Sequence, residues 1–130
     1  MRIIFTNGCF DIVHRYHLEL FKFCKQHGRV IVGLNSDASV RRLKGDTRPI
    51  NNQEDRKFLL ESIKYIDEVI IFDEDTPYNI IKRVRPSVIV KGGDYKAEDV
   101  VGSDLAEVLL FPYNSLYSTT GIINKIKKPL

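Results

Sequence analysis

The sequence predicts one α/β domain built on a five-stranded parallel sheet with helices on both faces. Five short apolar runs alternate with stretches of helical periodicity along the chain. The runs are almost continuously apolar, which is typical of parallel strands that are covered on both faces. The chain has 130 residues, of which 43% are hydrophobic, so it fits a single domain over residues 1–130. The alternation of apolar runs with helical stretches favours a Rossmann-like fold.

The first half of the chain predicts two strands, a helix and a loop. Arg2–Thr6 is an apolar run closed by an Asn-Gly pair, which indicates a buried strand followed by a turn. His14–His27 has apolar residues at helical spacing and Gly28 as a stop signal, so it predicts a helix. Arg29–Leu34 is the second apolar run, and the polar, basic stretch Asn35–Pro49 predicts a long loop with room for a helical turn.

The second half predicts three helices and three strands. Asn51–Tyr65 carries acids in its first turn, which suits a helix start, and the strand Glu68–Phe72 follows. In the helix Thr76–Val84, Thr76 is the expected cap and Pro77 the first helical residue. The last elements are the strands Val88–Val90 and Glu107–Phe111 and the helix Ser118–Lys127.

Composition narrows the function classes. A net charge of +3 is too small to favour nucleic acid or a membrane surface as partner, although the 20 basic residues leave enough cations for a local anionic site. No apolar run approaches the ~20 residues of a membrane span, and the N-terminus lacks a signal-peptide pattern. Two cysteines are too few for a disulfide framework. We expect a cytoplasmic protein that binds a phosphorylated small molecule.

Chemistry-bearing segments follow four of the five predicted strands. Ligands of parallel α/β sheets bind beyond the carboxyl ends of the strands, where the strand order switches. Residues 7–17, 35–37 and 91–95 stand directly after the first, second and fourth strands, and residues 117–120 follow the fifth. The fourth strand should neighbour the first across the switch point. The sequence therefore predicts one binding site at this edge of the sheet.

Two histidines in the first of these segments are the main candidates for chemistry. His14 and His17 lie on one face of the helix start, where imidazole and backbone N–H groups can bind an anion. Alternatively, one packs and the other is solvated. A zinc site would need Asp11 or Cys9 as a third ligand, and the spacing matches no standard zinc pattern. Asp11 could instead hold a ribose hydroxyl or position the turn, and Gly8 lets the backbone approach a ligand.

The other segments fit the same site. Gly92 and Gly93 permit backbone close to a ligand, Lys91 supplies charge and Asp94 an acceptor, although an ordinary Gly-Gly turn explains them equally well. Hydroxyl groups open the last helix, where one can cap it and the others can bind phosphate. Lys44 lies in a basic loop and could neutralise a triphosphate. Alternatively, this loop is only a solvated run of charges.

Together these motifs resemble the cytidylyltransferase-like nucleotidyltransferases that carry an H-x-G-H signature. The segments "TNGCFDIVH", "NSDASVRRLKGDTRPIN", "VKGGDY" and "STTGII" are similar to the heptose-phosphate adenylyltransferase domain, over nearly the whole chain. The segment "LESIKYIDEVI" and the compact length are similar to glycerol-3-phosphate cytidylyltransferase. The resemblance implies an enzyme that joins an NTP, with ATP favoured, to a sugar phosphate such as heptose 1-phosphate, releasing pyrophosphate. It also implies Mg²⁺ as cofactor and a homodimer.

The resemblance assigns roles to individual residues. It implies catalytic roles at the phosphates for His14, His17 and Lys44, and a substrate-positioning role for Arg56. The predicted nucleotide-binding residues are Asn7, Gly8, Cys9, Phe10, Asp11, Lys91, Gly92, Asp94, Ser118, Thr119 and Thr120.

Two positions depart from the signature. Tyr16 stands where the family has a glycine that makes room for the nucleotide, so its ring must swing away or stack on the base. In "FPYNSLY", Leu116 stands where a glycine is usual. Two alternatives to the adenylyltransferase interpretation follow: a CTP-dependent enzyme acting on glycerol 3-phosphate or a similar polyol phosphate, and a degenerate nucleotide-binding protein.

Overall fold

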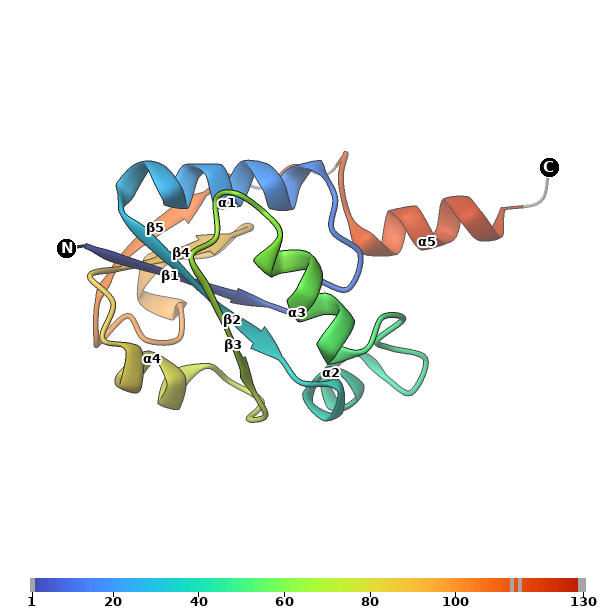
Figure 1. Cartoon of the computed structure of the whole chain (residues 1–130), viewed down its shortest axis with the longest axis horizontal. Helices are drawn as coiled ribbons and strands as arrows, with labels where there is room; N and C mark the ends of the chain where they lie inside the picture. Colours follow the sequence, from blue (N-terminus) through green and yellow to red (C-terminus); the bar gives the residue numbers. More distant parts are fainter. Residues whose placement is uncertain (1, 113, 115, 129–130) are drawn as a thin grey trace.

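The computed structural model describes residues 2–112, 114 and 116–128. It contains a five-stranded, fully parallel sheet in the order β3-β2-β1-β4-β5 (Figure 1). The strands are β1 (Ile3–Gly8), β2 (Arg29–Asn35), β3 (Glu68–Phe72), β4 (Val88–Gly92) and β5 (Glu107–Phe111). The helices are α1 (Arg15–His27), α2 (Asp37–Lys44), α3 (Gln53–Glu61), α4 (Tyr78–Val84) and α5 (Thr119–Lys127), with a 3₁₀ turn, η1, at Ala97–Asp99. The predicted fold class is confirmed.

The strand order places the switch point between β1 and β4. The chain runs outward from β1 through β2 to β3 and then returns to lay β4 against the other side of β1. Ile4 pairs with Val88 and Phe5 with Ile89 at this junction. The predicted neighbourhood of the first and fourth strands is therefore confirmed, and the crevice beyond them is the expected place for a ligand.

Two hydrophobic clusters hold the helices to the two faces of the sheet. On one face, α1 and α3 contribute Phe21, Cys24 and Leu60, each fully buried against β1 and β2. On the other face, α4 contributes Ile80 and Ile81. These continuous apolar strands bury both of their faces, which explains why the sequence shows runs rather than alternation.

The first and fourth strands extend beyond their predicted ends. Asn7 and Gly8 continue β1 opposite Gly33 and Leu34 of β2, so the turn predicted at the Asn-Gly pair is wrong. The backbone pairing offered by β2 outweighs the turn preference of that dipeptide. In the same way β4 continues to Gly92, opposite Phe111. Both extensions place predicted site residues at the carboxyl ends of these strands.

The helices between these strands differ from prediction at their ends. The expected loop Asn35–Pro49 contains the two-turn helix α2, capped by Ser36, whose hydroxyl accepts from the Ser39 N–H at 3.1 Å. Its outer turn is charged and exposed, so it lacks an apolar stripe in the sequence. The helix α3 ends at Glu61 rather than Tyr65. The helix α4 begins after Pro77, which is the cap in place of Thr76.

The C-terminal part contains α5 and the segment that precedes it. The helix α5 extends away from the rest of the molecule (Figure 1). One of the hydroxyl groups at its start caps it, as predicted: Ser118 accepts from the Gly121 N–H at 2.9 Å. Tyr113 and Ser115 of the "FPYNSLY" segment lie outside the described residues, and Leu116 is 81% exposed. Among the described helices, none is long and apolar enough to cross a membrane.

Candidate active site

An open cavity of about 1020 Å³ lies beyond the carboxyl ends of the central strands. Its walls come from the ends of β1 and β4, the starts of α1 and α5, and the last turn of α2. This volume is at the upper end of the range for small-molecule sites. The predicted site residues that line it are Asn7, Gly8, Cys9, Phe10, Asp11, His14, His17, Lys44, Lys91, Gly92, Asp94, Ser118, Thr119 and Thr120.

The two histidines form a stacked pair at the start of α1. Their ring centroids are 3.8 Å apart and the rings are inclined by 24°. The backbone N–H of His14, the N-cap, donates to Nδ1 of His17 at 3.2 Å. Since Nδ1 of His17 accepts, the proton of its neutral ring is on Nε2. The fold therefore orients His17 as an N–H donor at the cavity.

Burial keeps both histidines neutral. Desolvation, followed by the neighbouring His14, lowers the pKa of His17 from its usual 6.5 to about 4. Desolvation also lowers the pKa of His14. At neutral pH the pair therefore offers N–H donors rather than charges, and an arriving anion favours protonation of the pair.

Gly8 and Phe10 build the floor of the cavity together. Phe10 has a left-handed backbone, with φ of 44°, an uncommon conformation for a bulky residue. Its ring folds back so that a Cβ at Gly8 would lie 3.0 Å from it. The ring also packs edge-on against His17, with 5.2 Å between centroids. The absence of a side chain at Gly8 therefore leaves room for the Phe10 ring, in addition to the backbone access that the sequence suggested.

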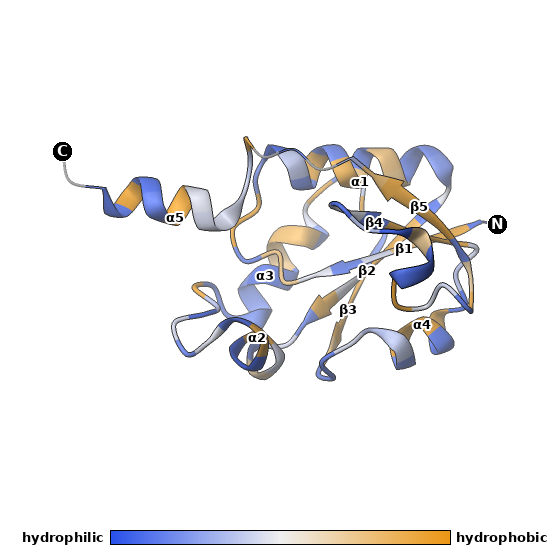
Figure 2. Ribbon diagram, turned by 180° about the vertical axis from the view of Figure 1, so that it is seen from behind, coloured by the Kyte–Doolittle hydropathy of each residue, from blue (hydrophilic) through white to orange (hydrophobic). Residues whose placement is uncertain are grey.

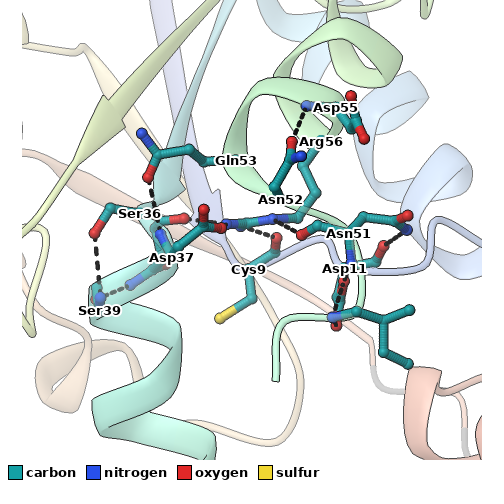
Figure 3. Close-up of polar contacts among 12 residues, drawn as sticks. Cys9, Asp11, Ser36, Asp37, Ser39, Asn51, Asn52, Gln53, Asp55 and Arg56 are labelled. Atoms are coloured by element: carbon teal, nitrogen blue, oxygen red, sulfur yellow. Dashed lines mark hydrogen bonds and ion pairs between the residues drawn. The ribbon is translucent and has the colours of Figure 1, made fainter. Parts of the chain in front are cut away.

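Asp11 holds in place the loop that contains Ile50 and Asn51, at one side of the site. It is buried, and its carboxylate accepts from the N–H groups of Ile50, at 2.8 Å, and Asn51, at 2.9 Å (Figure 3). The amide of Asn51 donates in return to the Asp11 carbonyl at 2.8 Å. These bonds favour a role for Asp11 in positioning the chain over a role in holding a ribose hydroxyl.

The start of α5 meets the basic loop across the cavity. Thr119 Oγ1 donates to the Ile12 carbonyl at 3.2 Å, which ties α5 to the loop before α1. Arg48 Nη2 donates to Thr120 Oγ1 at 3.4 Å. Lys44, at the end of α2, lines the cavity nearby and is exposed. Sequence reasoning missed Arg48, although it stands in the same basic stretch as Lys44.

The Lys-Gly-Gly-Asp segment at the end of β4 forms the opposite wall. Burial lowers the pKa of Lys91, whose Nζ lies 4.9 Å from the centre of the Tyr95 ring. Gly93 has φ of +122°, a conformation that favours glycine. Asp94 is exposed at the cavity edge.

Tyr16 lies against the sheet edge. Its ring packs on Phe111, with centroids 5.4 Å apart, and its hydroxyl donates to the Phe111 carbonyl at 3.3 Å. The ring thus swings toward β4 and β5 while still lining the cavity. Stacking of this ring on a nucleotide base remains a prediction.

Arg56 is placed differently from the prediction. Its side chain is 0% exposed and does not line the cavity. The guanidinium donates to the carbonyls of Cys9, Asn35 and Asn51 and to the Asp37 carboxylate, all at 2.8–2.9 Å (Figure 3). Because these bonds join the ends of β1 and β2 to α2 and α3, Arg56 supports the site from beneath the cavity.

The described residues contain no group of three or more His, Cys, Asp or Glu side chains able to hold a metal ion. The Asp11 carboxylate already accepts backbone N–H groups, and Asp94 stands at the cavity edge. These residues do not build a protein cage for Mg²⁺.

The cavity lies at the switch point of a parallel sheet, and its lining includes the histidine pair, Lys44 and Lys91. The sequence model of the cytidylyltransferase-like family matches residues 5–124, and the chain belongs to this family. It is accordingly a nucleotidyltransferase.

Curated relatives cover almost the whole of this chain. The bifunctional protein HldE of a Nitratiruptor species is 56% identical over 97% of the chain, and that of Campylobacter concisus is 52% identical over 97%. The chain spans only 28% and 27% of the lengths of these two relatives. The crystal structure of the lipopolysaccharide core biosynthesis protein from Thermoplasma volcanium is similar with a TM-score of 0.72 and 25% identity, covering 91% of this chain and 99% of that one.

Proposed function

We propose that this domain transfers a nucleotidyl group from an NTP, with ATP favoured, to a sugar phosphate such as heptose 1-phosphate. The observation that carries the proposal is the histidine pair at the start of α1, which faces Lys44, Arg48 and the start of α5 across one cavity. The resemblance to heptose-phosphate adenylyltransferases and the lipopolysaccharide role named for the structural relative support the sugar substrate.

In the proposed reaction, a phosphate oxygen of the sugar phosphate attacks the α-phosphorus of the nucleotide. A new phosphorus–oxygen bond forms, the bond to the β-phosphate oxygen breaks, and pyrophosphate leaves with its electron pair. Such a transfer needs positioning and charge neutralisation more than a covalent nucleophile. His14 and His17 are proposed to donate hydrogen bonds to the phosphates, and the nucleotide is proposed to enter as its Mg²⁺ complex.

Cys9 takes no part as a nucleophile in this proposal. It lines the cavity, but burial raises the pKa of its thiol. The thiolate, not the thiol, is the nucleophilic form. Both cysteines are free, which is compatible with the cytoplasmic location that we also propose.

A panel assay of pyrophosphate release tests the proposal, with four NTPs against several sugar and polyol phosphates. We expect release to require one NTP and one sugar phosphate together, with ATP the best donor. A preference for CTP with glycerol 3-phosphate would instead identify a polyol-phosphate cytidylyltransferase.

Tyr16 allows a second test within the same panel. If the native protein binds ATP but releases no pyrophosphate with any acceptor, and Tyr16→Gly restores release, the protein is a degenerate nucleotide-binding domain. We expect release from the native protein, because the ring rests against the β4–β5 edge.

A further inference from the structure

Arg48 carries a guanidinium group at the cavity with little of its hydrogen-bonding capacity taken up. It lines the cavity and is half-buried. Its Nη2 donates to Thr120 Oγ1 at 3.4 Å, which is the only hydrogen bond that the guanidinium makes within the described residues. No acidic side chain in that part of the chain forms an ion pair with Arg48. Most of its N–H donors can therefore bind a ligand.

Two arginines of the flanking helices are used differently. The buried Arg56 of α3 donates to three carbonyls and one carboxylate. Arg42 of α2 donates through Nε to the Asp75 carboxylate at 2.8 Å and through Nη2 to the Asp73 carbonyl. Both groups are spent on the fold. Arg48 is the arginine of this region whose partner is a neutral hydroxyl.

The backbone on both sides of Arg48 is held in place. The Arg48 N–H donates to the Gly45 carbonyl at 3.1 Å. Two residues further on, the N–H groups of Ile50 and Asn51 donate to the Asp11 carboxylate at 2.8 and 2.9 Å. Figure 2 shows this loop as a largely hydrophilic segment at the end of the molecule from which α5 also extends. An anchored loop reduces the conformational entropy that Arg48 would lose on binding a ligand.

Few groups supply permanent positive charge in the cavity. Burial lowers the pKa of both histidines, so this pair is neutral at neutral pH, and burial also lowers the pKa of Lys91. A guanidinium stays protonated throughout the physiological range. Burial raises the pKa of the Cys9 thiol, and the charges of Lys44 and Arg48 oppose this effect. Since Cys9 lines the cavity, both charges act on the same part of it.

The carboxylates that line the cavity are engaged elsewhere or lie at its edge. Asp11 accepts backbone N–H groups, Asp75 pairs with an arginine of α2 at 2.8 Å, and Asp94 is exposed. None of them forms an ion pair with Lys44 or Arg48. Among the described residues, these two cations therefore line the cavity without a counter-ion, which suits a strongly anionic ligand.

We propose that Arg48 is a catalytic residue that binds the β- and γ-phosphates of the nucleotide, the part that leaves as pyrophosphate. This assignment rests on the proposed function. The leaving pyrophosphate carries most of the negative charge of the triphosphate and gains more as its bond to the α-phosphorus breaks. The planar fork of a guanidinium matches phosphate oxygens. The contact with Thr120 places the start of α5 beside the same anion.

Binding of three probes in the absence of a sugar phosphate tests the assignment, because it needs no turnover. The probes are ATP, inorganic pyrophosphate and AMP, each titrated calorimetrically in the presence of Mg²⁺. Arg48→Gln should weaken the binding of ATP and of pyrophosphate by about 10–100-fold, the effect of losing a hydrogen-bonded charge, and leave AMP binding unchanged. Arg48→Lys should recover part of this loss, since it keeps the charge but not the fork.

Arg41→Gln is the matched control. Arg41 is an exposed residue of α2 in the same basic stretch, and it does not line the cavity. This variant should leave all three affinities unchanged. The melting temperature without ligand should change little in every variant, because the bond between Arg48 and Thr120 is long and exposed.

Steady-state kinetics separates contact with the nucleotide from a merely structural role. In Arg48→Gln, kcat/KM for ATP should fall at least as much as the affinity for ATP, while the KM for the sugar phosphate stays near its native value. If Arg48 only tied its loop to α5, the binding of ATP and of AMP would weaken together.

Equal losses for ATP and AMP would therefore overturn the proposal, as would an unchanged affinity for pyrophosphate. A change confined to the KM for the sugar phosphate would also overturn it, because Arg48 would then bind the acceptor. If ATP binding depends on Arg48 as described but the native protein releases no pyrophosphate with any acceptor, the assignment stands and the proposed function fails. A native protein that binds neither ATP nor pyrophosphate would contradict both.

Discussion

The hydroxyl of Tyr16 occupies the space that a side chain at Gly92 would need. A Cβ built on Gly92 would lie 2.8 Å from the Tyr16 hydroxyl oxygen. The same hydroxyl donates to the Phe111 carbonyl on the neighbouring strand at 3.3 Å. Tyr16 and Gly92 are thus a fitted pair at the edge of the cavity, and the residue that departs from the family signature is accommodated by a glycine of β4.

This fit predicts coupling between the two positions. Gly92→Ala should destabilise the native protein by about 1–3 kcal/mol, because the methyl group meets the fixed phenol. In a Tyr16→Phe background, which lacks the hydroxyl, the same substitution should cost less. Chemical denaturation of the two single variants and the double variant measures the coupling. Additive effects would show that the close approach is relieved elsewhere.

The histidine pair predicts a loss of turnover without a loss of fold. His14→Ala and His17→Ala should each reduce pyrophosphate release by about 10²–10³-fold, the effect typical of removing one donor that stabilises transition-state charge. His27→Ala, at the far end of the same helix, is the control and should keep native turnover. Near-native turnover in both of the first two variants would overturn the assignment of the site.

The depressed pKa of His17 predicts a pH-dependent stability. The folded pKa is about 4 and the unfolded pKa about 6.5, so the unfolded chain binds the proton first. The contribution of the neutral ring is complete above pH 6.5 and is lost as the pH falls to 4. The shift corresponds to a loss of up to about 3 kcal/mol over this window.

Urea unfolding of the native protein and of His17→Gln between about pH 7 and pH 4 measures this loss. The variant should show a shallower decline in stability, and the part that remains should include His14, whose pKa is lowered in the same direction. Identical declines in both proteins would mean that His17 is not the group responsible.

The sequence was sufficient to predict the five strands and most of the residues that line the cavity. Buried parallel strands are visible in the sequence as apolar runs, and the ligand site of such a sheet lies at the carboxyl ends of its strands. The sequence alone therefore predicted that His14, Lys91 and Ser118 line one site. The helix α2 was missed because only Ser39 and Val40 are buried in it, which leaves no apolar periodicity.

The role of Arg56 could not be predicted, because a buried arginine looks like any surface cation in the sequence. Its burial depends on carbonyl oxygens at Cys9, Asn35 and Asn51, which come together only in the folded chain. The resemblance to relatives indicated a functional position, and the structure supplies a structural reason for an arginine there. Similarly, the orientation of Tyr16 depends on Phe111, which is 95 residues away.

The last prediction concerns Arg56. It distinguishes a structural role, in which Arg56 supports the site, from a role in which Arg56 contacts the substrate. Arg56→Met should destabilise the protein by about 3 kcal/mol or more, since three carbonyls lose their donor and the Asp37 carboxylate loses its partner. Arg56→Lys should recover only part of this, because an ammonium cannot reproduce the fork of a guanidinium. Lys57→Met, at the neighbouring, partly exposed position, should change stability little. Melting temperatures and the KM for ATP, measured well below the melting point, decide between the roles. A raised KM with an unchanged melting temperature would return Arg56 to the substrate-contacting role that the resemblance implies.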